Sequence, residues 1–143
     1  MMNKEELIAK LKVQHRELEI NLHNALSLCD GAHENAGEQI HTELERFQNT
    51  LTEHLTLEDT TFYPEYFKMK IAIGEGVEST QTFFEEIKSI GAKVNSFLNT
   101  YNSPEAITTS LDLFTQDLKS ITAVLRVRLE TEEESVYEIF LLM

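Results

Sequence analysis

Apolar residues recur along most of this chain at alternating intervals of four and three positions. This spacing places them on one face of an α-helix, and such a face must be buried against other helices. The pattern predicts four helices, over about 4–28, 37–67, 78–100 and 103–143. The last of them begins with Ser103 and Pro104, which are typical residues at a helix start.

Four long helices joined by shorter connections favour an all-α fold, an up-down-up-down antiparallel four-helix bundle. The length of 143 residues suits one domain, which we expect to span 1–143. Only five Gly and two Pro interrupt the chain, so long helices are the default expectation. The connection at 67–76 is the longest, and it has room for a short extra helical turn.

The formal net charge of −13 at pH 7 argues against two classes of partner. Nucleic acid phosphates and an anionic membrane surface would both repel this chain. No apolar run approaches the roughly 18 residues of a membrane span, and the charged N-terminal segment is unlike a signal peptide. We therefore expect a cytoplasmic protein. The single Cys29 has no second cysteine for an internal disulfide.

Five positions on the predicted buried faces are polar instead of apolar. Burying a charged side chain without a partner costs several kcal/mol, so these side chains are expected to meet in the core. Imidazole with carboxylate oxygen is a donor set that suits iron, manganese or zinc. The positions are His15, His54, Glu58, Arg128 and Glu132.

The spacing of these residues favours a shared metal site. His54 and Glu58 stand one helical turn apart on one face, so both can reach one ion, and His15 of a neighbouring helix can add a third ligand. A buried Glu58–Arg128 ion pair is the structural alternative. The other histidines, His23, His33 and His41, lie off the buried faces, and we expect them at the surface. We expect the same of three neighbours of Glu132, which are Glu130, Glu133 and Glu134.

Two segments of the chain, 54–67 and 128–141, align without a gap and form an internal repeat. In this alignment Glu58 matches Glu132 and Tyr63 matches Tyr137, whereas His54 is matched by Arg128. The second and fourth helices of the bundle run in the same direction. The two polar pairs are therefore expected at a similar level of the core.

Three segments, VQHRELEINL, HLTLEDTTFYPEY and EIKSIGAKV, resemble the helices of the hemerythrin-like, HHE cation-binding domain. The resemblance covers nearly the whole chain, and it is most specific in the second helix. There His54 and Glu58, with Tyr63 and Pro64 after them, match the family motif. The resemblance implies four metal ligands, which are His15, His54, Glu58 and Glu132.

The sequence departs from the family pattern at the second of two metals. Family members usually hold two oxygen-bridged irons, and histidines of the third and fourth helices bind one of them. The resemblance places Phe84 and Arg128 at such positions, and neither side chain has a lone pair for a metal. A complete di-iron centre and reversible oxygen binding are therefore not expected. A guanidinium can instead balance the buried carboxylates.

Two interpretations of the function remain open. In the first, the chain binds one metal ion, iron or another divalent metal such as manganese or zinc, and serves metal handling or sensing of oxygen, nitric oxide or redox state. In the second, it binds no metal, and an arginine and carboxylate network fills the core of a bundle that contacts a protein partner or a second copy of itself. A third interpretation, catalysis at a single metal ion, has less support, because no general base or substrate pocket is indicated, and no catalytic residue is assigned.

Overall fold

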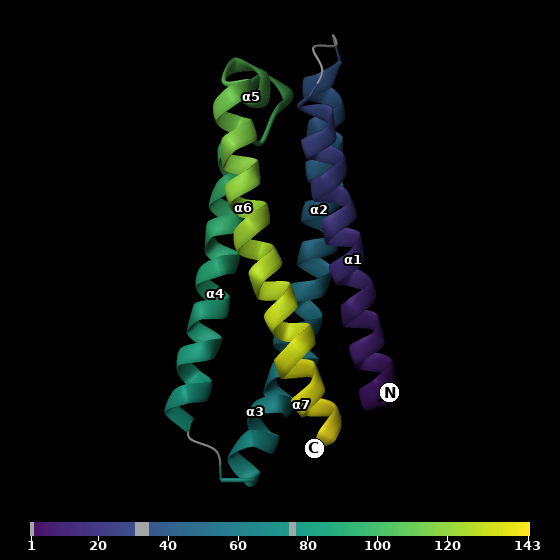
Figure 1. Cartoon of the computed structure of the whole chain (residues 1–143), viewed down its shortest axis with the longest axis vertical. Helices are drawn as coiled ribbons and strands as arrows, with labels where there is room; N and C mark the ends of the chain where they lie inside the picture. Colours follow the sequence, from purple (N-terminus) through teal and green to yellow (C-terminus); the bar gives the residue numbers. More distant parts are fainter. Residues whose placement is uncertain (1, 31–34, 75–76) are drawn as a thin grey trace.

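The computed structural model describes residues 2–30, 35–74 and 77–143, with 77–80 described by their backbone alone. Within these ranges, four long helical rods lie side by side and alternate in direction (Figure 1). This arrangement confirms the predicted all-α, up-down-up-down bundle. Both ends of the chain lie at the same end of the bundle.

Two of the rods are single helices and two are interrupted. The first rod is α1 (Lys4–Leu28), and the third is α4 (Val77–Thr100). The second rod consists of α2 (Ala36–Leu57), a π-helical turn η1 (Glu58–Phe62) and α3 (Tyr63–Ala72). The fourth consists of α5 (Pro104–Thr109), α6 (Leu111–Thr131), a second π-helical turn η2 (Glu132–Val136) and α7 (Tyr137–Leu142).

The fourth rod begins as predicted but is not continuous. Ser103 caps α5, where its Oγ accepts a hydrogen bond from the Ala106 N–H at 3.1 Å. The rod then breaks at Ser110, which has φ −138° and ψ 59°. The Thr109 hydroxyl, just before the break, donates to a carbonyl of the preceding turn, and such bonds compete with the helix ladder. The short α5 lies against the start of α2.

The second rod extends past its predicted end at residue 67. Pro64 does not stop it, because this residue lies in the first turn of α3, where a missing N–H is tolerated. The predicted connection at 67–76 is therefore helical as far as Ala72, and residues 75 and 76 lie outside the described ranges.

The two π-helical turns occupy equivalent positions of the internal repeat. Each begins at the repeated glutamate, and the N–H of the repeated tyrosine donates to that glutamate's carbonyl oxygen, from Tyr63 to Glu58 and from Tyr137 to Glu132. A π turn inserts one residue into an α-helix and shifts the buried face after it. Ile139, which follows the predicted pattern, is consequently 38% exposed, whereas its neighbour Phe140 is 1% exposed. The inward prediction for Ile139 was wrong for this reason.

The core consists of two apolar clusters. One surrounds Phe47 and Phe114, towards the end of the bundle that carries α5. The other surrounds Phe62 and Phe140, near the chain termini. The buried polar residues of the sequence pattern lie at or near the boundary between the two clusters, so they form a polar layer inside the bundle.

The contact between α2 and α5 is so close that it requires glycine at position 37. A Cβ atom at Gly37 would lie 2.6 Å from Thr108 Cγ2 and 3.1 Å from the Pro104 carbonyl oxygen. We therefore expect Gly37→Ala to lower the free energy of unfolding by about 1–3 kcal/mol. Gly91→Ala is the matched control, because a Cβ there meets no atom within 4 Å. It should raise stability by about 0.5–1 kcal/mol through helix propensity.

Urea denaturation of the two glycine variants checks this prediction. If Gly37→Ala proves as stable as the wild type, the approach of α5 to α2 is looser than the structure places it.

Among the helices of the described residues, none has the length and apolar character of a membrane-spanning segment.

Candidate metal centre

The polar layer brings together the five polar side chains that the sequence pattern places in the core, and Gln14 joins them. Its members come from α1, from the junction of α2 with η1, and from the junction of α6 with η2. All are between 0% and 7% exposed. Among the described residues they are the buried polar and charged set: Gln14, His15, His54, Glu58, Arg128 and Glu132.

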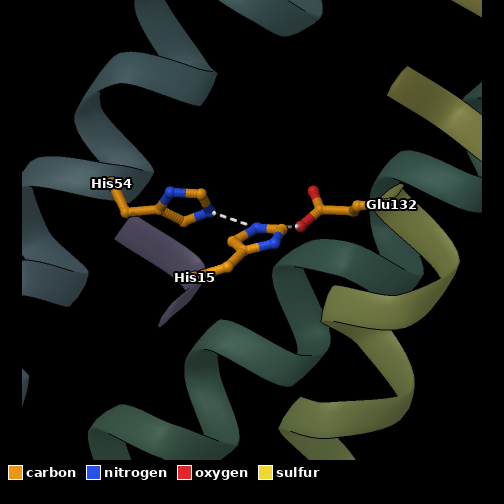
Figure 2. A group of neighbouring side chains, drawn as sticks. All are labelled: His15, His54 and Glu132. Atoms are coloured by element: carbon orange, nitrogen blue, oxygen red, sulfur yellow. Dashed lines mark hydrogen bonds and ion pairs between the residues drawn. The ribbon is translucent and has the colours of Figure 1, made fainter. Parts of the chain in front are cut away.

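Three of these residues offer ligand atoms to one point. His15, His54 and Glu132 each provide one atom, and these atoms lie within 4.8 Å of one another. Figure 2 shows the three side chains extending toward a common centre from separate helices. Glu58 joins from the side of His54, with its Oε1 atom 2.9 Å from His54 Nε2. The structure thus brings together all four predicted ligands.

The Nδ1 atom of each histidine is the outer ring nitrogen, and it lies beside an oxygen that can accept a hydrogen bond but cannot donate one. His54 Nδ1 lies 2.8 Å from Gln14 Oε1, and His15 Nδ1 lies 3.0 Å from Glu133 Oε2. Both Nδ1 atoms must therefore carry the proton and donate it. In a neutral imidazole this leaves a lone pair on Nε2. Burial lowers the pKa of His54 to about 3, so that imidazole is neutral at pH 7.

The inner nitrogens and carboxylate oxygens face one another with few protons between them. The two Nε2 atoms are 3.2 Å apart, and His15 Nε2 is also 3.2 Å from Glu132 Oε1. Apart from the facing histidines, Glu58 Oε1 and Glu132 Oε1 have no hydrogen-bond partner in the described residues. We call these four atoms, the two Nε2 and the two Oε1, the acceptor cluster. Buried acceptors without donors are costly, and a cation would satisfy them.

The pKa values of the two carboxyl groups shift in opposite directions. Burial and the neighbouring Glu132 raise the pKa of Glu58 well above its ordinary value. Burial also acts to raise the pKa of Glu132, but its contacts with Glu58 and His15 and the charge of Arg128 lower it overall. The pair therefore shares one proton, carried by Glu58. Such opposed shifts are frequent at functional sites.

Arg128 supplies the fixed positive charge of the layer. Its Nη2 donates to Glu132 Oε2 at 3.1 Å and lies 3.9 Å from Glu58 Oε1. It therefore lies close to both carboxylates. Its Nε has no hydrogen-bond partner among the described residues, so the network around it is incomplete.

The repeated tyrosines hold the repeated glutamates in a crossed arrangement. Tyr63 Oη donates to Glu132 Oε2 at 2.5 Å, and Tyr137 Oη donates to Glu58 Oε2 at 3.3 Å. Burial and the nearby carboxylates raise the pKa of both phenols, which therefore keep their protons. Each half of the repeat thus orients the carboxylate of the other half. Tyr137 Oη also lies 3.1 Å from His15 Nε2.

The described side chains of the third rod add no ligand atom to this centre. Its residues next to the layer are Ile87, Ile90, Gly91 and Val94, which line a cavity of about 20 Å³ beside His54. Phe84 packs against the rings of Tyr63 and Phe67, at centroid distances of 5.7 and 5.0 Å. Where the resemblance implies a histidine for a second metal, the structure has aromatic packing.

Most of the residues that we expect at the surface lie there, and Glu133 is the exception. His23, Glu130 and Glu134 are exposed, and His41 binds Glu45 and the Asn102 carbonyl at the surface. His33 lies outside the described residues. Glu133 departs from the expectation, because it is only 35% exposed and binds His15.

Sequence reasoning missed the two groups that orient the histidines, Gln14 and Glu133. Gln14 precedes His15 directly and lies off the apolar spacing. Its one available signal was its place beside a buried histidine.

Comparison with known proteins agrees with this geometry. The sequence matches the family described as Hemerythrin HHE cation binding domain over residues 6–140. No curated protein and no solved structure gives a significant match. The matched range contains the whole polar layer, the first repeat, and the second repeat except for its last residue.

Proposed function

Because the chain belongs to the Hemerythrin HHE cation binding domain family, we propose that its acceptor cluster holds a single metal ion, and that this ion is iron. The ligands would be His15 and His54 with the carboxylates of Glu58 and Glu132. The proposal rests on one observation, the four buried acceptor atoms that face one another. One proton serves them, the proton that the carboxyl pair shares, because the Tyr137 hydroxyl donates to Glu58 Oε2.

The composition of the cluster favours iron. Two histidines and one carboxylate, as in the group of His15, His54 and Glu132, are the donor set of many non-haem Fe(II) sites. Manganese and zinc accept the same donors, so they are the alternatives. The ion would supply positive charge to the carboxylates and a redox couple to the core.

Arg128 takes the place of a second metal in this proposal. Its Nη2 donates to Glu132 and lies 3.9 Å from Glu58 Oε1. A second cation there would meet a fixed guanidinium, and the adjoining residues of α4 offer no ligand. One ion per chain is therefore the expected stoichiometry.

The role that fits best is metal handling or the sensing of a small molecule such as oxygen or nitric oxide. The cavity beside His54 has a volume of about 20 Å³, which holds one water-sized molecule. It has no room for an organic substrate. A cytoplasmic location stays a prediction from the sequence.

Metal loading tests the proposal. Chelator-treated protein would be dialysed anaerobically against ferrous iron, and bound iron would be measured by elemental analysis. We expect about one iron per chain in the wild type and in His41→Ala, whose histidine binds Glu45 and a backbone carbonyl at the surface. His15→Ala should retain almost none. Two irons per chain would contradict the role assigned to Arg128.

The alternative function is a metal-free bundle that contacts a protein partner or a second copy of the chain. The Arg128–Glu132 bond favours it, because a guanidinium already offsets part of the carboxylate charge. Under this alternative the wild type binds no iron at any loading, and His15→Ala leaves the protein unchanged in every metal assay.

A further inference from the structure

The two histidines differ in the groups that hold their outer nitrogens. His54 donates to the amide oxygen of Gln14, which is neutral and 6% exposed. His15 donates to the carboxylate of Glu133, which is charged and 35% exposed. One imidazole is thus paired with a fixed negative charge near the solvent, and the other with a buried dipole.

This difference matters for any ion bound at the inner nitrogens. A carboxylate that accepts the Nδ1–H makes the imidazole a stronger electron donor through Nε2. A stronger donor stabilises the more highly charged state of a metal, because the added negative charge is matched better by the higher positive charge. An amide partner orients the ring without adding charge.

The local backbone explains how Glu133 reaches its position. Glu132 and Glu133 are consecutive residues at the start of η2. Glu132 Oε1 lies 3.2 Å from His15 Nε2, whereas Glu133 Oε2 lies 3.0 Å from His15 Nδ1. The two carboxylates therefore contact opposite nitrogens of one ring. The next residue, Glu134, is exposed.

We propose that Glu133 is a positioning residue that sets the affinity and the reduction potential of the bound metal through His15. This inference rests on the proposed function, since it assigns a regulator to the same site. Glu133 does not touch the acceptor cluster itself. It fixes the tautomer and the orientation of His15, and it places a negative charge behind that ring.

The test compares iron-loaded variants by redox titration and by competition with a chelator. Glu133→Gln should shift the midpoint potential of the ferric/ferrous couple to a more positive value. It should also weaken iron binding roughly 10–100-fold. Glu134→Gln is the matched control, because it removes the same charge one residue away at an exposed position. It should leave both quantities close to those of the wild type.

The reverse substitution gives a second readout. Gln14→Glu places a carboxylate behind His54 and should shift the potential to a more negative value. Equal shifts in Glu133→Gln and Glu134→Gln would overturn the inference, since net charge alone would then explain them. An iron-loaded Glu133→Gln protein with unchanged potential would also overturn it while the proposed function stands. A wild-type chain that holds no iron would overturn the proposed function and this inference together.

Discussion

Replacing Arg128 with methionine is expected to lower the free energy of unfolding of the metal-free protein by about 3–5 kcal/mol. Arg128 is 7% exposed, and it is the cation that donates to Glu132 and approaches Glu58. Methionine keeps most of the volume but leaves the carboxyl pair without this charge. Removing one partner of a buried ion pair costs more than the pair contributes, because the other partner stays buried.

Urea denaturation in the presence of a chelator measures this effect, and Arg126→Met is the matched control. Arg126 is exposed and lies on the same helix, so its replacement should change the stability by less than about 0.5 kcal/mol. Iron should restore part of the stability of Arg128→Met, because a cation would again lie beside the carboxylates. A loss no larger than that of Arg126→Met would show that the guanidinium does not balance this core.

Ferrous iron is expected to stabilise the folded protein by about 4 kcal/mol when its free concentration is a thousandfold above the dissociation constant. The physical reason is that the acceptor cluster forms only in the folded state, where ligands from three segments distant in sequence meet. For a chain of this size the midpoint of thermal unfolding should rise by roughly 10 °C. His54→Ala should remove most of this rise.

Thermal unfolding under anaerobic conditions, with and without iron, measures the shift. His23→Ala is the control, because His23 is exposed and should leave the rise intact. Mg²⁺ should have little effect, since it prefers oxygen ligands and keeps its waters. An equal rise in the wild type and in His54→Ala would place the bound iron elsewhere on the protein.

The sequence alone determined the fold class and every member of the polar layer except Gln14. Periodicity is a local property, so the four-three spacing was sufficient to place His15, His54 and Glu58 on buried faces, where the structure has them. The spacing also placed Arg128 and Glu132 at the same level through the internal repeat.

Only the tertiary structure decided what surrounds these residues. The spacing rule assumes an uninterrupted α-helix, but each repeat contains a π turn that starts at its glutamate. The extra residue of the turn moves later side chains to a new face, which is why Phe140 is buried in place of Ile139. The spacing of apolar residues along one helix does not predict such a shift.

The partners of the histidines and glutamates likewise come from other helices. Tyr63 binds Glu132 and Tyr137 binds Glu58, each across the bundle. Glu133 meets His15, a residue of the first helix. Such contacts depend on the height and rotation of one rod against another. Packing of the whole core sets both, so a sequence pattern can name the buried polar residues but not the groups that orient them.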